Sequence, residues 1–263
     1  MFGFAKLRRA IIRGLQPYGI DLRAARQSRR GRAAYLVNRD AYFARAGDEF
    51  PRGADWPCWR DRFEAGGVAG GQYFHQDLLV AQWISAAGPR RHVDVGSRID
   101  GFVAHVASFR EIDVLDLRPV RSSASGIRFH QHDITTDDPA WESATDSLSC
   151  LHSIEHFGLG RYGDDVDPDA WRTGWANLVK MVEPGGTVYL STMIGPQRVE
   201  FDAHRVFAVS TLLDLVQPAC EVLEFAYVDD LGELHTGVDW TSPEVDSSFG
   251  CQSGCGILRL RRR

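Results

Sequence analysis

No stretch of this sequence approaches the roughly 18 consecutive apolar residues that a membrane-spanning helix requires. The first nine residues also lack the uninterrupted apolar core and the cleavage site of a secretory signal. Hydrophobic residues nevertheless make up 44% of the 263 residues, an ordinary share for a globular protein. We therefore predict a cytoplasmic protein with one large domain, or with a smaller domain and an appendage.

Cysteine is scarce, and its spacing does not suit a disulfide framework or a zinc site. The five cysteines are odd in number and scattered, at Cys58, Cys150, Cys220, Cys251 and Cys255. Only the last two are close, and no second Cys or His pair lies nearby to complete a tetrahedral site. Reduced, structural cysteines are predicted.

Acidic residues are nearly absent from the N-terminal part of the chain. Residues 1–35 carry nine Lys or Arg and one acid, Asp21, whereas the remainder has 21 basic and 34 acidic residues. This asymmetry predicts a basic appendage on an acidic domain. No nucleic-acid partner is predicted, because a reader motif and interleaved aromatic residues are both missing.

The basic segment begins with apolar residues at helical spacing, at Phe4, Leu7, Ile11, Ile12 and Leu15. Such a helix suits contact with an anionic membrane surface, here the inner face of the membrane, or with a partner protein. The alternative, which we favour, is docking on the protein's own domain. Residues 45–72 are rich in Gly and Pro and form a connection or a lid. We therefore divide the chain into a basic helical extension, 1–72, and an α/β domain, 73–263.

From residue 72 onward, short apolar runs alternate with helical patterns. Strands are expected at 93–95, 112–117, 127–129, 146–151, 187–192 and 222–228, and helices at 72–87, 103–109, 171–181 and 211–216. This alternation predicts a doubly wound, mostly parallel α/β sheet with helices on both faces. The terminal run 259–263 is expected to be a solvated tail.

Acids stand at the ends of the first three expected strands. Asp94 precedes a small-residue turn at Gly96 and Ser97, where a ligand can approach the backbone closely. Asp116 follows Gly96 by 20 residues and is placed to accept hydrogen bonds from both hydroxyls of a ribose. Asp133 ends the third strand and is placed to accept from an adenine amino group. The alternatives are a turn acid paired with its neighbour for Asp116 and a helix-capping acid for Asp133.

This ordered set of acids, with Ile154-Glu155-His156 after the fourth strand and Pro184-Gly185-Gly186 before the fifth, resembles the class I S-adenosylmethionine-dependent methyltransferases over residues 75–230. The resemblance implies S-adenosylmethionine as cofactor and S-adenosylhomocysteine as product. It also implies cofactor-binding roles: the methionine end for Asp94, Gly96 and Ser97, the ribose for Asp116, the adenine for Asp133 and the sulfonium for His152. Arg98 replaces a customary glycine and would place a guanidinium near the cofactor carboxylate.

Two further stretches, 155–164 and 201–207, resemble an uncharacterised bacterial family of methyltransferase-like proteins associated with surface-polysaccharide and sugar modification. This narrower resemblance implies a glycan or small-molecule acceptor, with methyl transfer to a sugar hydroxyl. Two other functions remain as alternatives. One is a non-catalytic module that binds the cofactor or a glycan, and the other is a nicotinamide-dependent sugar oxidoreductase. The second lacks the Tyr-x-x-x-Lys pair of short-chain dehydrogenases.

Methyl transfer to a hydroxyl requires positioning and a base that removes the proton. The bases available in the two loops are His152, His204 and Asp164. We rank His152 first, and a structural, hydrogen-bonded histidine is the alternative in each case. Arg161 and Tyr162 are expected to orient the acceptor, and His156 is assigned a structural role.

Metal binding is not predicted. The acid-rich stretch from Asp165 to Asp169 has Ala170 and Ala176 where a calcium loop needs Gly and Glu. A divalent ion held between the acceptor and Asp164 or Asp165 is the weaker alternative.

Overall fold

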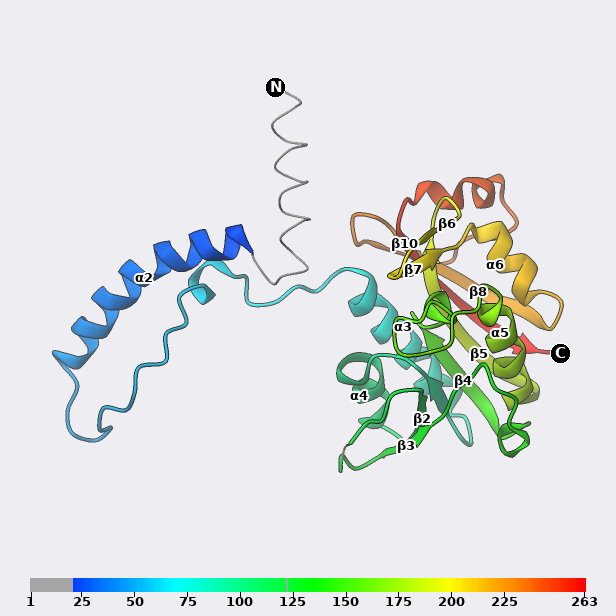
Figure 1. Ribbon diagram of the computed structural model, residues 1–263, viewed down its shortest axis with the longest axis horizontal. Coiled ribbons are helices and arrows are strands. Elements are labelled where there is room, and N and C mark those ends of the chain that lie inside the picture. The colour runs from blue at the N-terminus through cyan, green and yellow to red at the C-terminus, as the bar shows by residue number, and fades with distance from the viewer. Residues whose placement is uncertain (1–20, 122) are drawn as a thin grey trace, which may run out of the picture. The chain divides into compact units, whose positions relative to one another are not determined.

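The computed structural model describes residues 21–121 and 123–263 (Figure 1). The amphipathic helix predicted over residues 4–15 lies outside these described residues. The chain divides into two compact units, residues 1–68 and 69–263, which are described separately.

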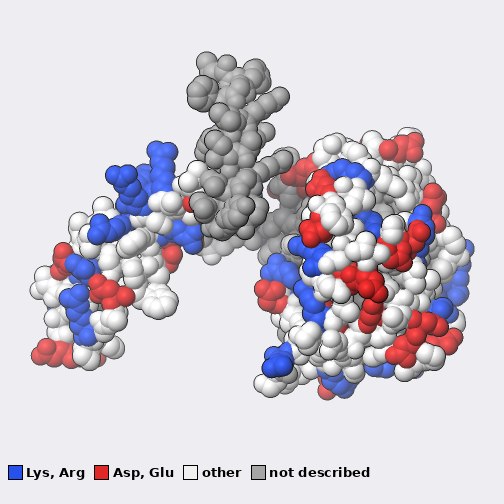
Figure 2. Space-filling model, viewed as in Figure 1, with Lys and Arg blue, Asp and Glu red and all other residues white. Residues whose placement is uncertain are grey.

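From residue 21 onward, the first unit contains helix α2 (Leu22–Phe43) and the mostly irregular segment that follows it. The carboxylate of Asp21 accepts a hydrogen bond from the backbone N–H of Ala24 at 3.0 Å and so caps the first turn. The returning segment contacts α2 through the rings of Tyr35 and Trp59, whose centroids are 6.4 Å apart. Basic side chains gather along this helix (Figure 2).

The second unit contains a sheet of eight strands in the order β3-β2-β1-β4-β5-β10-β8-β9. Its strands are β1 (Val93–Val95), β2 (Ile112–Asp116), β3 (Ile127–Gln131), β4 (Thr145–Leu151), β5 (Val182–Ile194), β8 (Cys220–Val228), β9 (Leu234–His235) and β10 (Gly254–Arg262). The first five are parallel, whereas β10 is antiparallel to both β5 and β8. A separate hairpin pairs β6 (Arg198–Glu200) with β7 (His204–Val206). The predicted doubly wound, mostly parallel sheet is confirmed.

Helices cover both faces of this sheet (Figure 1). On one face α3 (Gln72–Ala87) and α4 (Ala104–Ala107) contribute to one hydrophobic core, and on the other α5 (Ala170–Met181) and α6 (Val209–Val216) contribute to a second. Helix α3 buries Val80, Ala81 and Ile84, which share one helical face. It ends at Gly88, whose φ of 56° forms a left-handed C-cap. Within the described residues, no helix is both long and apolar enough to cross a membrane.

The end of the chain corrects one prediction. Residues 259–263 do not form a solvated tail, because 254–262 form β10 in the interior of the sheet. Leu258 and Leu260 are buried, while the intervening Arg259 pairs with Glu224 of β8 at 2.7 Å. Buried apolar side chains here alternate with basic side chains that pair with acids of β8, so the two faces of the strand differ.

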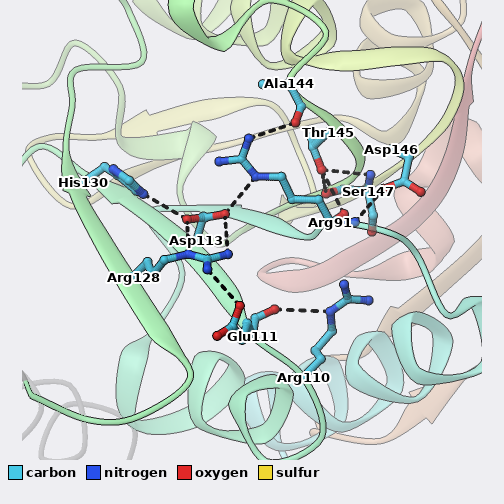
Figure 3. Close-up of polar contacts among 10 residues, drawn as sticks. All are labelled: Arg91, Arg110, Glu111, Asp113, Arg128, His130, Ala144, Thr145, Asp146 and Ser147. Atoms are coloured by element: carbon cyan, nitrogen blue, oxygen red, sulfur yellow. Dashed lines mark hydrogen bonds and ion pairs between the residues drawn. The ribbon is translucent and has the colours of Figure 1, made fainter.

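A buried carboxylate ties the amino ends of the first three strands together (Figure 3). Asp113 of β2 accepts from Arg91 at 2.9 Å, from Arg128 of β3 at 3.0 Å and lies 3.0 Å from Nε2 of His130. Burial alone would raise the pKa of Asp113, but these donors lower it to about 2. The cluster is structural, since it lies at the strand ends opposite to those where ligands bind in such sheets.

Candidate active site

A pocket of about 620 Å³, partly open to solvent, lies at the carboxyl ends of β1, β2, β3 and β4. Strand β1 pairs with both β2 and β4, so the strand order reverses here and the connecting chains leave a crevice. The predicted residues that line it are Gly96, Asp116, Asp133, His152, Tyr162 and Asp164.

The turn after β1 is held by the acid that precedes it. The Asp94 carboxylate is fully buried and accepts from the backbone N–H of Ser97 at 3.1 Å and from the hydroxyls of Ser97 and Ser149, each at 2.5 Å. Burial raises the pKa of Asp94 to about 6, although these hydrogen bonds oppose the shift. Asp94 and Ser97 therefore shape the turn, and Gly96 is the residue of this turn that reaches the pocket lining.

Gly96 is required by the geometry of that turn. Its φ is 70°, a left-handed conformation, and a Cβ at this position would overlap the hydroxyl of Ser153 after β4. Arg98, predicted to approach the cofactor carboxylate, instead pairs with Asp100 at 2.8 Å and lies over the ring of Tyr73 at 5.1 Å. The structure does not bring Arg98 into the pocket lining.

Asp116 lies at the end of β2 and is 9% exposed. Its Oδ1 accepts from the backbone N–H and from Nε of Arg118, at 2.8 and 3.0 Å, and its Oδ2 accepts from the other end of the guanidinium at 2.9 Å. The guanidinium also lies 4.3 Å above the ring of Tyr162. The predicted pairing of Asp116 with its neighbour is thus present, and Oδ2 keeps acceptor capacity for a ligand hydroxyl.

Asp133 caps the turn after β3 and also faces the pocket. Its Oδ1 accepts from the backbone N–H and the hydroxyl of Thr135, at 2.9 and 2.7 Å. Its Oδ2 has no hydrogen-bond partner within residues 21–121 and 123–263. Capping and ligand binding are therefore compatible at this residue.

His152 is buried in an ion pair. Its Nδ1 lies 2.7 Å from Oε1 of Glu155, and its φ of 48° is unusual for a residue with a side chain. Burial alone would lower the pKa of His152, but the Glu155 carboxylate, with the Cys255 thiol nearby, raises it well above its usual range. The pKa of Glu155 is correspondingly lowered, against the effect of its burial. Both shifts favour the ionised form of the pair, and Nε2 of His152 is buried without a hydrogen-bond partner among the described residues.

The loop after β4 is organised by Asp164. Its Oδ2 accepts from the backbone N–H groups of Gly158 and Gly160, at 2.8 and 3.2 Å, and its Oδ1 accepts from that of Tyr162 at 3.1 Å. Buried Arg205 of β7 fixes the same loop by donating to the carbonyl of Phe157 at 2.6 Å. Asp164 thus acts on the loop backbone while it contributes to the pocket wall.

Two of the residues predicted to act on the acceptor, Arg161 and His204, do not line the pocket. Arg161 donates to the carbonyl of Ala203 at 2.8 Å, and Nε2 of His204 lies 3.5 Å from the Glu200 carboxylate. The first contact joins the loop after β4 to the β6–β7 hairpin, and the second lies within the hairpin. No cluster of three or more metal-ligating side chains occurs among the described residues.

His156, assigned a structural role from sequence, lines the pocket. Its Nδ1 lies 2.7 Å from the carbonyl oxygen of Ala203, 47 residues further along the chain. The ring also meets Tyr162 edge-on at 5.5 Å. No local sequence signal marks this arrangement, because it depends on the hairpin that follows β5.

Residues 120–228 match a protein family described as "Caenorhabditis protein of unknown function, DUF268". The match covers less than half of the chain but includes the loop after β4 and the β6–β7 hairpin. A search of curated protein sequences gives no match.

Solved methyltransferases have a similar fold. The 1,6-didemethyltoxoflavin-N1-methyltransferase of Burkholderia thailandensis, solved with 1,6-didemethyltoxoflavin and S-adenosylhomocysteine, superposes with a TM-score of 0.50 at 14% identity, over 71% of this chain and 78% of its own. The N-methyltransferase NodS of Bradyrhizobium japonicum, in complex with S-adenosylhomocysteine, gives a TM-score of 0.49 at 16% identity, over 73% of this chain and 88% of its own. At such identities the likeness to the first structure shows the fold, which is that of a class I methyltransferase.

Proposed function

We propose that this protein is an S-adenosylmethionine-dependent methyltransferase that transfers a methyl group to a sugar hydroxyl of a glycan or surface-polysaccharide precursor in the cytoplasm. The observation that carries the proposal is the pocket at the reversal of strand order, where Gly96, Asp116 and Asp133 meet. The methyltransferase fold supports the reaction class, and the resemblance of residues 155–164 and 201–207 supports the acceptor class.

The residues of the pocket fit a nucleoside. Asp116 and Asp133 line it and each keeps acceptor capacity, one suited to ribose hydroxyls and the other to an adenine amino group. Between them the wall is apolar, with Leu117, Ile134 and Phe157, as a purine ring requires. Gly96 allows the backbone of the first turn to approach the rest of the cofactor closely.

Bound S-adenosylmethionine would supply an electrophilic methyl group on a sulfonium sulfur. The protein's residues bind and orient the two reactants, and Asp94 and Ser97 hold the turn that contacts the cofactor. The buried His152–Glu155 pair fixes the floor of the pocket after β4.

Isothermal titration with S-adenosylmethionine and S-adenosylhomocysteine tests the proposal. We expect micromolar binding by the wild-type protein. Asp116→Ala should abolish this binding or weaken it at least tenfold, because it removes one charge-assisted hydrogen-bonding group. Asp214→Asn, which removes a carboxylate from the exposed side of α6, is the matched control and should bind normally.

Absence of binding by the folded wild-type protein would contradict the proposal. Binding of a nicotinamide dinucleotide instead would favour the sugar oxidoreductase. Cofactor binding with no turnover of any glycan or nucleotide-sugar acceptor would favour the non-catalytic module.

A further inference from the structure

We propose that His156 is the general base of this site and that its Nε2 receives the proton of an acceptor hydroxyl. The inference rests on the proposed methyltransferase function and deepens it, because it specifies the acceptor chemistry. Three observations carry it: the anchored ring of His156, the burial or backbone bonding of the competing bases, and the position of His156 in the pocket wall.

A carbonyl oxygen accepts hydrogen bonds and cannot donate them, so the 2.7 Å contact with Ala203 places the proton of His156 on Nδ1. In the neutral imidazole, Nε2 then carries the lone pair. The anchoring carbonyl fixes both the tautomer and the orientation of the ring, as an orienting group does for other histidine bases. His156 is half-buried and is one of the residues that line the pocket.

The other candidate bases are buried or bonded to their own loop. His152 contacts Glu155 through Nδ1, and its Nε2 is buried without a hydrogen-bond partner in the part of the chain that the structure describes. The Asp164 carboxylate accepts three backbone N–H groups of its own loop. Nε2 of His204 is buried, lies near Glu200, and does not reach the pocket wall.

The electrostatic surroundings favour the neutral form of His156. The groups around it are Glu155, His152, Arg161 and Tyr162 from its own loop and His204 from β7. Burial lowers the pKa of His156, and the positive charges of Arg161 and His152 lower it further, while Glu155 and the Ala203 carbonyl act in the opposite direction. The net shift is downward, which suits a base that must be unprotonated at neutral pH.

A neutral base specifies the acceptor. A carboxylate acceptor carries no proton and an uncharged amine attacks without prior deprotonation, so a positioned imidazole is needed most by a hydroxyl. The acceptor oxygen forms a bond to the methyl carbon as the carbon–sulfur bond breaks and its electron pair stays on sulfur. The hydroxyl proton moves to Nε2 of His156 and then to solvent. The structure therefore favours an alcohol or sugar hydroxyl over a carboxylate.

The first arm of the test reads the imidazole directly. Full-length protein labelled with ¹³C and ¹⁵N in histidine is titrated by NMR, with the His156 signals assigned by their loss in His156→Asn. We expect the neutral Nδ1–H tautomer at pH 7 and a titration midpoint below 6.5. A charged ring at pH 7, or the Nε2–H tautomer, would overturn the proposal.

The second arm measures methyl transfer from radiolabelled S-adenosylmethionine to a panel of nucleotide-sugars and methyl glycosides. His156→Asn keeps an amide N–H for the Ala203 carbonyl but lacks a base, so kcat should fall about 10²- to 10⁴-fold while the Kd for S-adenosylhomocysteine is unchanged. His235→Asn, at the distant β9, is the matched control. Turnover by His156→Asn at the wild-type rate, or a loss matched by weaker cofactor binding, would contradict the proposal.

The two proposals fail differently. Absence of S-adenosylhomocysteine binding by the wild-type protein would count against the methyltransferase function. Normal cofactor binding together with a charged or reversed His156 imidazole would count against the base alone.

Discussion

Asp94 and Asp113 lie in neighbouring strands and are both buried, yet their environments shift their pKa values in opposite directions. Asp113 meets two guanidinium groups and an imidazole, whereas Asp94 meets hydroxyls and one backbone N–H. Cations compensate the cost of burying a charge more fully than neutral donors do. The two residues should therefore give opposite pH dependences of stability.

For Asp113→Asn we expect a loss of about 2 kcal/mol in the free energy of unfolding at pH 7, since the native pKa near 2 lies below the unfolded value of 3.8. This contribution is present above pH 4 and disappears as the pH falls toward 2. Urea denaturation across this range measures it. Glu111→Gln removes only an exposed partner of Arg128 and should cost less than about 0.5 kcal/mol. Equal losses in the two variants would refute the role of burial.

Asp94 should act in the other direction. Its native pKa of about 6 exceeds the unfolded value, so ionisation between pH 4 and 7 costs the wild-type protein about 3 kcal/mol of stability. Asp94→Asn removes the ionisable group, and its stability should decline less over the same range. Parallel stability curves for the two proteins in urea would show that Asp94 does not titrate as described.

At the scale of elements, the turn between β1 and the helical segment depends on one residue without a side chain. Gly96→Ala combines a left-handed φ with an overlap against Ser153. We expect the free energy of unfolding to fall by about 1 kcal/mol or more, since the left-handed conformation alone costs that much. S-adenosylhomocysteine binding should also be weaker. Thermal unfolding and calorimetric titration measure the two effects.

The matched control is Gly88→Ala at the end of α3. Gly88 also has a positive φ, but a Cβ there meets no atom within 4 Å. Gly88→Ala should lower the free energy of unfolding by about 1 kcal/mol and leave ligand binding unchanged. Equal effects on binding would mean that the overlap with Ser153 is not what Gly96 avoids.

The elements themselves were largely predictable, because the signals that define them are local. The positions of α3, β1 and β4 follow from runs of apolar residues bounded by Gly, Pro and charged residues, and the acids at the strand ends follow from chain order. Strand β10 was missed because its arginines suggested exposure to solvent. They pair instead with Glu224 and Glu221 of β8, which is adjacent in the sheet but lies well before β10 in the chain. The orienting contact of His156 was missed for the same reason, since its partner lies on a hairpin that the sequence pattern does not show.

At the scale of the whole molecule, both hydrophobic cores belong to the second unit, and among residues 21–121 and 123–263 they include none before Leu79. A fragment of residues 69–263 should therefore unfold in one cooperative transition and bind S-adenosylhomocysteine within about threefold of the full chain, a difference under 1 kcal/mol. Urea denaturation and calorimetric titration of both proteins measure this. A fragment without a cooperative transition, or with binding weakened more than tenfold, would show that residues 1–68 complete the domain.

The interior position of β10 constrains the order in which the strands of the sheet can assemble during synthesis. Strand β8 is joined to β5 only through β10, although β8 is synthesised well before it. While residues 254–262 are still inside the ribosome, the five parallel strands can assemble and β8 can pair with β9, but the strand that joins β8 to β5 is missing. The emerging chain must therefore carry an open sheet edge on β5, the kind of surface that chaperones shield, until the late strand inserts and closes the gap.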